Sequence, residues 1–173
     1  SAWVESDRNL PSAESISEHM LRSKRFLAEK FGLDPKDVNM DFHPDSFGHT
    51  PVMPELLNAG GVKYFYHCRG LEGNFIYRWR APSGAEVLAI NEPSWYNDPI
   101  RPGYLSLVIP FCEMFGGIDG MIKVYGVGDH GGGPTRRDLN RAIEMQGWPV
   151  FPELRFGTLL KQAEGLKDLK VRG

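Results

Sequence analysis

Apolar positions in the first third of the chain follow a helical spacing and then short strand-like runs. Apolar residues recur from Ile16 to Phe31 at the spacing of one helix face, which predicts a helix capped at Ser12 and ended by Gly32. Short runs bounded by turn residues then predict a strand, a helix and a strand over residues 37–42, 51–59 and 62–68. This alternation is typical of a parallel sheet with crossover helices.

The rest of the chain shows shorter elements. Residues 74–80 and 86–90 flank a Pro-Ser-Gly turn, which predicts a hairpin or two successive strands. We also predict helices over residues 105–115, 136–145 and 159–163, and strands over residues 121–125 and 154–156. Pro110 predicts a kink in the first of these helices. The whole pattern predicts one α/β domain over residues 1–173, with a mainly parallel sheet and crossover helices.

Composition narrows the class of protein. Hydrophobic residues make up 41% and charged residues 24% of the 173 residues, which excludes a disordered or collagen-like chain. The net charge of -2 provides no basic field for nucleic acid, and no apolar run is long enough to span a bilayer. The 20 glycines and 13 prolines predict many turns or functional loops. We therefore expect no nucleic-acid partner and no membrane association.

Cysteine usage and the first residues say little about the compartment. Cys68 and Cys112 are too few for a disulfide framework, and we interpret them as small buried side chains. The chain opens with Ser1 rather than Met and shows no signal peptide, so we expect a processed or excised piece. The compartment stays unknown, and a cytoplasmic, bacterial protein is the favoured interpretation.

Two polar loops follow predicted strands, over residues 43–49 and 126–135, and each carries one Asp. Ligands bind at the carboxyl ends of parallel strands, so Asp45 and Asp129 are candidates for a common cleft. Two carboxylates in one cleft suit glycoside hydrolysis, with one as nucleophile and the other as acid and base. The same layout suits a metal, and Asp is also a common turn residue. The residue types alone do not decide between a glycosidase site, a metal site and a structural turn.

The first loop also contains candidate zinc ligands. His43 and Asp45 form a His-x-Asp pair and His49 follows, and imidazole and carboxylate both bind zinc. The alternative is that these are loop histidines bonded to the backbone. The glycine-rich second loop does not fit a nucleotide-binding P-loop, because no Lys-Ser/Thr pair follows its last glycine.

Aromatic residues in the predicted loops suit a carbohydrate ligand. Phe47, Trp95 and Tyr96 offer rings on which the C–H faces of a sugar pack. Arg80 ends a predicted strand in the same region and is a candidate partner for a carboxylate.

These segments together resemble glycoside hydrolase family 38, the α-mannosidases. The Pro-Asp-Ser-Phe-Gly-His sequence resembles the nucleophile motif of that family, and the other matching stretches flank it on both sides in the family's order. The matching segments are residues 3–15 (with Ala13 where Gly is usual), 44–49, 79–80, 95–97 and 125–136 (with His130 in place of Gly).

The resemblance implies a retaining, exo-acting α-mannosidase that contains Zn²⁺ and acts on a mannoside or mannose-containing glycan. It implies that Asp45 is both nucleophile and zinc ligand, Asp129 the acid/base, and Phe47 an aromatic beside the sugar. It implies, less directly, that Arg80 lies near the nucleophile. Trp95 and Tyr96 resemble further substrate-binding residues of the family.

The resemblance also implies that this chain is an internal fragment of a larger catalytic domain. The family's other zinc ligands match no residue here, so we expect zinc to be weak or absent in this chain alone. The fold implied is an incomplete (β/α)7 barrel-like domain. We expect this fragment alone to be inactive and its open sheet edges to allow a homo-oligomer. The alternatives are a metal-dependent carbohydrate deacetylase using His43, Asp45 and His49, and an inactive sugar-binding fragment.

Overall fold

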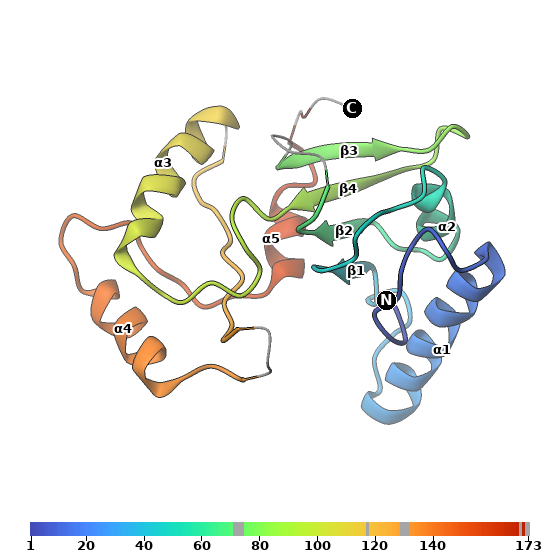
Figure 1. Cartoon of the computed structure of the whole chain (residues 1–173), viewed down its shortest axis with the longest axis horizontal. Helices are drawn as coiled ribbons and strands as arrows, with labels where there is room; N and C mark the ends of the chain where they lie inside the picture. The colour runs from blue at the N-terminus through green and yellow to red at the C-terminus, as the bar shows by residue number, and fades with distance from the viewer. Residues whose placement is uncertain (71–74, 117, 129–131, 170, 172–173) are drawn as a thin grey trace. The chain divides into compact units, whose positions relative to one another are not determined.

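The computed structural model divides into two compact units, which are described separately (Figure 1). The first unit comprises residues 1–93 with the last residues of the chain, and the second comprises residues 94–169. The residues that the structure describes are 1–70, 75–116, 118–128, 132–169 and 171. Within these ranges, no helix combines the length and apolarity needed to cross a membrane.

The first unit contains a four-stranded sheet. Its strands are β1 (Met40–His43), β2 (Tyr64–His67), β3 (Ile76–Arg80) and β4 (Glu86–Asn91). The strand order is β1-β2-β4-β3, with β1, β2 and β4 parallel and β3 antiparallel to β4. The β3–β4 pair confirms the predicted hairpin, and the three parallel strands confirm a mainly parallel sheet of modest size.

Two helices of the first unit agree with their predicted positions. Helix α1 (Ala13–Phe31) begins after Ser12, whose side chain accepts from the backbone nitrogen of Ser15, and ends at Gly32. Gly32 has φ = 67°, a left-handed conformation that favours glycine. Helix α2 (Met53–Ala59) connects the parallel strands β1 and β2 as a crossover helix. Between β2 and β4 the described residues contain β3 and no second crossover helix.

The core of the first unit lies between these two helices and one face of the sheet. Side chains of α1, α2, β2 and β4 form one buried cluster, with Leu56 and Trp79 packed against it. The buried members are Ile16, Met20, Met53, Leu57, Val62, Phe65 and Val87. Burial of a large apolar side chain contributes about 1.5–3 kcal/mol, so this cluster holds α1 and α2 on the sheet.

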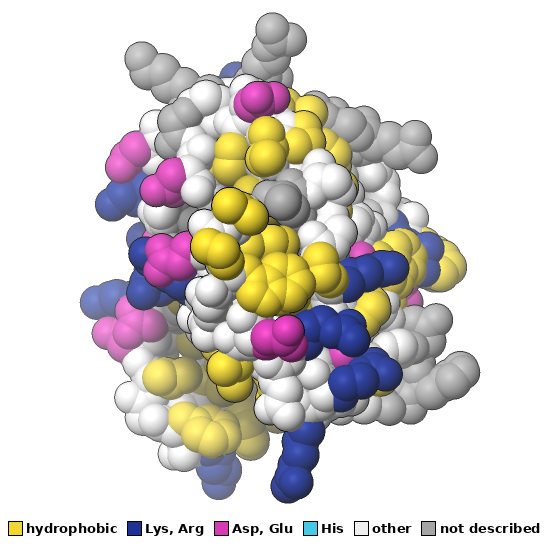
Figure 2. Space-filling view, turned by 90° about the vertical axis from the view of Figure 1, so that its left-hand side faces the viewer, with side chains coloured by type: hydrophobic (Ala, Val, Ile, Leu, Met, Phe, Trp, Pro, Cys, Tyr) yellow, Lys and Arg dark blue, Asp and Glu magenta, His cyan; other side chains and the backbone are white. Residues whose placement is uncertain are grey.

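The described part of the second unit is helical. It contains a short 3-10 helix (Pro102–Tyr104), α3 (Leu105–Met114), α4 (Arg136–Gln146) and α5 (Leu159–Gly165). These helices confirm the three predictions, and Pro110 lies inside α3. Figure 2 views the side on which Figure 1 draws α3 and α4, and hydrophobic side chains are visible there between charged groups.

Two predicted strands are wrong. Residues 121–125 and 154–156 are irregular, and the first segment makes only an isolated parallel bridge between Tyr125 and Asp98. An apolar run becomes a strand only where a partner strand completes its hydrogen bonds. No sheet forms within the described residues of the second unit, so neither run finds such a partner.

Candidate functional site

Asp45 lies two residues beyond the carboxyl end of β1, in the predicted loop. Arg69, two residues beyond the end of β2, donates from Nε to Asp45 Oδ1 at 2.7 Å, and its Nη2 lies 2.6 Å from the same oxygen. Across the described part of the chain, no hydrogen bond or ion pair reaches Asp45 Oδ2. One carboxylate oxygen is therefore oriented by a cation, while the other has no partner among the described residues.

Phe47 stands beside this ion pair. The guanidinium carbon of Arg69 lies 4.3 Å from the centre of the Phe47 ring, a cation–π contact. The ring is 77% exposed, which is unusual for a large aromatic side chain. Asp45 and Phe47 line an open hollow of about 340 Å³, a volume that suits a small ligand. The other lining residues are Glu5, Ser6, Asp7 and Ser46.

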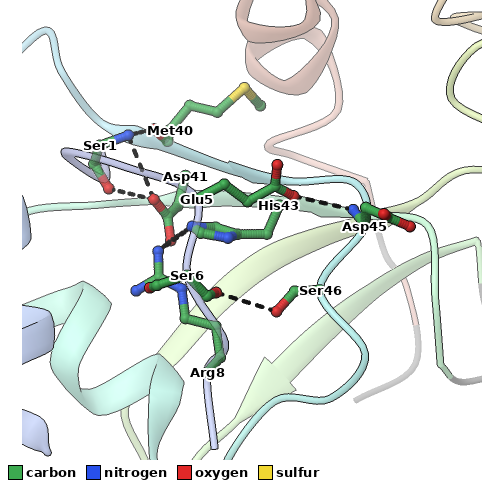
Figure 3. Close-up of polar contacts among 9 residues, drawn as sticks. All are labelled: Ser1, Glu5, Ser6, Arg8, Met40, Asp41, His43, Asp45 and Ser46. Carbon is green, nitrogen blue, oxygen red and sulfur yellow. Dashed lines mark hydrogen bonds and ion pairs between the residues drawn. The ribbon is translucent and has the colours of Figure 1, made fainter. Parts of the chain in front are cut away.

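Beneath the loop, β1 carries a buried charged cluster (Figure 3). Arg8, Asp41 and His43 have fully buried side chains. Arg8 Nη2 donates to Asp41 Oδ2 at 2.7 Å and also to His43 Nε2. Burial alone would raise the pKa of Asp41, but the His43 ring 3.4 Å from Asp41 Oδ2 and the charge of Arg8 outweigh it and hold that pKa well below its usual range. Asp41 is thus the buried counter-ion of Arg8.

His49 lies in an aromatic environment rather than beside Asp45. Its ring makes edge contacts with Phe65, His67 and Trp79 at centroid distances of 5.1, 5.5 and 6.0 Å. Neither ring nitrogen has a hydrogen-bond partner among the described residues. Burial, followed by the charges of His67 and other neighbouring cations, lowers the pKa of His49 to about 4.

Arg80 is not brought to Asp45. It pairs in register with Glu86, the first residue of β4, and donates from Nη2 to Glu86 Oε2 at 2.8 Å. The carboxyl ends of the parallel strands are marked by His43, His67 and Asn91, which lie in register with one another. Arg80 therefore lies at the opposite end of the sheet, and Arg69 is the arginine beside the nucleophile candidate.

Trp95 and Tyr96 belong to the second unit, where their ring centroids lie 5.1 Å apart. Their loop is held in place, since Lys123 Nζ donates to the backbone oxygen of Trp95 and forms an ion pair with Asp98 at 3.3 Å. The two rings are neighbours within this unit, and their role in substrate binding stays a prediction.

The glycine-rich loop of the second unit is closed at its base. The backbone nitrogen of Thr135 donates to the Tyr125 hydroxyl at 2.9 Å, and Thr135 caps α4 by accepting from the nitrogen of Asp138. The predicted strand before this loop is absent, so the expected delivery of a second carboxylate from a strand end is not seen. Asp129, the predicted acid/base, lies outside the described residues.

The described residues do not fit a zinc site. They contain no group of three or more His, Cys, Asp or Glu side chains that could hold a metal ion. A catalytic zinc needs about three protein ligands. Asp45 bonds to Arg69, His43 to Arg8, and His49 lies among aromatic rings. The set His43, Asp45 and His49, on which the deacetylase alternative depends, is therefore not assembled as a ligand set.

Comparison with known proteins assigns the family. The profile described as "Glycosyl hydrolases family 38 N-terminal domain" matches residues 1–168. The chain belongs to this family. This confirms the resemblance seen in the loop motifs and places the chain among family 38 glycoside hydrolases.

Relatives of this family 38 chain are named α-mannosidases. The chain is 30% identical over 174 residues to "Alpha-mannosidase" of Saccharomyces cerevisiae and 28% identical over 163 residues to "Alpha-mannosidase G" of Dictyostelium discoideum. Each match covers 90% of this chain and 15% of the relative. The chain thus spans about a seventh of the length of the curated relatives that it matches.

A solved structure supports the fold. The crystal structure of an α-mannosidase from Enterococcus faecalis V583 matches with a TM-score of 0.68 and 21% identity. The match covers 97% of this chain and 21% of the solved chain. At this identity the likeness shows that this chain shares the fold of the matched part of the solved chain.

Several site residues were missed from the sequence. Arg69 follows β2 as Asp45 follows β1, so the rule that ligands gather at strand ends could have found it. Glu5 and Arg8 could not have been found in this way, because they lie in an irregular segment 40 and 33 positions before their partners Asp45 and Asp41. A contact between residues so far apart in the sequence cannot be predicted from the local spacing of residues.

Proposed function

We propose that this chain is the part of a retaining exo-α-mannosidase that carries the catalytic nucleophile, Asp45. One observation carries the proposal: Asp45 lines an open hollow and is held at one carboxylate oxygen by Arg69, which itself lies over the Phe47 ring. The family assignment and the α-mannosidase names of the relatives support the substrate class.

The chemistry proposed for Asp45 is displacement at the anomeric carbon. Oδ2 forms a bond to that carbon while the bond to the leaving oxygen breaks, and a glycosyl ester of Asp45 results. Water then hydrolyses the ester, so the sugar leaves with its original configuration. Arg69 fixes Oδ1 and thereby the direction in which Oδ2 points.

Other residues take supporting roles in the proposal. Asp129 donates a proton to the leaving oxygen and later accepts one from the attacking water, for which a retaining enzyme needs about 5–5.5 Å between the two carboxyl groups. Phe47 packs on the apolar face of the sugar, and Trp95 with Tyr96 supplies a second aromatic surface. Arg69 takes the role beside the nucleophile that the sequence assigned to Arg80.

Zinc, the barrel and the quaternary state are proposed only for the longer protein. We propose that ligands outside this chain complete a zinc site with Asp45 and that further strands extend the sheet into a (β/α)7 barrel. The chain alone is then inactive. The outer strands of the described sheet are β1 and β3, and we propose that pairing with the remaining strands or with a second copy takes place at these edges. We favour a cytoplasmic, bacterial protein.

The proposal is tested in the longer protein that contains this chain. Hydrolysis of an aryl α-mannoside is measured for the wild type, for Asp45→Asn and for the exposed control Asp37→Asn. We expect Asp45→Asn to abolish turnover, because an amide is a poor nucleophile, and the control to retain it. Unchanged turnover in Asp45→Asn contradicts the proposal. Release of acetate from an acetylated sugar without mannoside hydrolysis supports the deacetylase instead.

A further inference from the structure

The first residues of the chain run alongside β1 and the loop that follows it, residues 44–50, which we call the nucleophile loop. We call residues 1–9 the strap. Six contacts of the strap join it to a residue 39 to 42 positions later, so the two segments run in the same direction (Figure 3). The contacts are Ser1 to Met40 and Asp41, Glu5 to Asp45, Ser6 to Ser46, and Arg8 to His49 and Thr50.

Both ends of the strap are anchored. The backbone nitrogen of Ser1 donates to Met40 O at 2.7 Å, and its hydroxyl donates to Asp41 Oδ1 at 2.7 Å. Arg8 is anchored by its buried ion pair with Asp41, and its backbone oxygen accepts from the nitrogen of Thr50 at 3.4 Å. Separating a buried guanidinium from its carboxylate costs several kcal/mol of free energy. Detachment of the strap from the loop is therefore strongly unfavourable.

Between the anchors, the strap contacts the reacting residue itself. The backbone nitrogen of Asp45 donates to Glu5 Oε1 at 3.2 Å, and the hydroxyl of Ser46 donates to the backbone oxygen of Ser6 at 3.3 Å. The strap also packs closely at Gly48, where an added methyl group would collide with the Asn9 amide. Asp45 is thus held from two directions, through its backbone by Glu5 and through its carboxylate by Arg69.

We propose that Glu5 is a positioning residue that holds the backbone of Asp45 for reaction. The inference rests on the proposed role of Asp45 as nucleophile. Glu5 acts as a hydrogen-bond acceptor: its carboxylate receives the Asp45 N–H and does not transfer a proton. The anchors at Ser1 and Arg8 fix the strap, and the strap fixes Glu5. An error of about 1 Å in the placement of a reacting group can lower the rate about 100-fold. A contact that fixes the position of Asp45 can therefore affect the rate even though it takes no part in the reaction.

A hydrogen-bond acceptor role for Glu5 can be distinguished experimentally from an acid/base role. Glu5 also lines the hollow, so a second carboxylate function is the obvious rival. Gln keeps an acceptor oxygen at the same position and cannot ionise, whereas Ala removes the acceptor. A hydrogen bond of this kind contributes about 1 kcal/mol, which corresponds to about fivefold in rate.

The experiment compares Glu5→Ala and Glu5→Gln in the longer protein, with Glu29→Ala on the exposed face of α1 as the matched control. We expect Glu5→Ala to lower kcat on an aryl α-mannoside about fivefold with KM little changed, and Glu5→Gln to recover most of the loss. Equal impairment of the two variants overturns the proposal in favour of an acid/base role. Wild-type kcat in Glu5→Ala overturns it outright.

A second measurement does not depend on activity. Amide hydrogen exchange of the peptide covering residues 43–50 is followed by mass spectrometry without substrate. Glu5→Ala should exchange faster there than the wild type, and Glu5→Gln and Glu29→Ala should not. If the protein hydrolyses no mannoside, the proposed function fails while this measurement still decides whether Glu5 holds the loop. Unchanged exchange in Glu5→Ala overturns the positioning role.

Discussion

Arg69 makes both of its contacts with Asp45 at the same carboxylate oxygen. Nε and Nη2 of Arg69 lie 2.7 and 2.6 Å from Asp45 Oδ1. A bidentate contact of the guanidinium with both carboxylate oxygens would give a stronger ion pair, but it would occupy Oδ2, the atom needed for attack. The one-sided contact therefore orients the carboxylate and keeps Oδ2 available, which is the arrangement that a nucleophile requires.

Replacing Arg69 should impair catalysis far more than replacing Arg80. Arg69→Met removes hydrogen bonds to a charged group, worth about 1.5–3 kcal/mol, and should lower kcat about 10- to 100-fold. Arg80→Met removes an exposed pair with Glu86 at the other end of the sheet and should leave kcat nearly unchanged. Steady-state kinetics of both variants in the longer protein provide the check. A larger loss in Arg80→Met would restore the assignment made from sequence.

Breaking the buried pair of Arg8 and Asp41 should destabilise the fold strongly. Either Arg8→Met or Asp41→Asn leaves an uncompensated buried group, and loss of one partner costs about 3–5 kcal/mol. The double variant should be less destabilised than the sum of the two single variants, because neither charge is then left alone. Urea unfolding followed by fluorescence measures the cycle. Additive effects would show that the two side chains do not interact.

Stability should fall as the pH drops from about 6.5 to about 4, partly because of His49. The pKa of His49 is lowered from 6.5 to about 4 by burial and neighbouring positive charge. In that window the unfolded chain binds a proton that the folded chain does not, so the free energy of unfolding decreases as protons are added. This contribution is fully present above pH 6.5. His67 contributes in the same direction, because burial lowers its pKa as well.

The variant His49→Phe tests this origin of the pH dependence. Phe keeps an aromatic ring among Phe65 and Trp79 but cannot bind a proton. Unfolding free energies at several pH values between 4 and 7 should show a shallower slope than in the wild type. An identical slope would mean that His49 is not protonated preferentially in the unfolded state.

The core cluster should be sensitive to loss of volume. Leu57 is fully buried on α2, and Leu57→Ala should cost about 2–5 kcal/mol of unfolding free energy. Leu10 is 86% exposed, and Leu10→Ala should cost less than about 0.5 kcal/mol. The pair of variants, compared by urea unfolding, separates burial from residue type. Similar costs for the two would contradict the packing described here.

Elements with strong local signals were predictable. Helix α1 has a helical apolar spacing, a Ser cap and a terminal Gly, and its bounds agree with the prediction. The segments at 121–125 and 154–156 were apolar but failed as strands, because pairing depends on a partner that local sequence does not specify. Strand β1 shows the same limit, since its polar residues Asp41 and His43 are buried while Phe42 is 45% exposed.

The site was predictable where a motif or a strand end marked it. Asp45 and Phe47, which the loop motif singled out, line one hollow, and their roles in it stay predictions. The buried polar face of β1 reverses the usual alternation because Arg8 arrives from the strap and pairs with Asp41. A contact between residues so far apart in the chain leaves no periodic signal. Sequence alone therefore reported the nucleophile candidate but not the residues that hold it.

The most direct test of the central claim is the position of a covalent glycosyl group on the longer protein. A fluorinated mannosyl fluoride carries a good leaving group, while its ring fluorine slows breakdown of the glycosyl ester. Treated protein is digested, and the labelled peptide is sequenced by mass spectrometry. We predict a single label on Asp45, absent from Asp45→Asn. A label on any other carboxylate would contradict the assignment of Asp45 as the nucleophile.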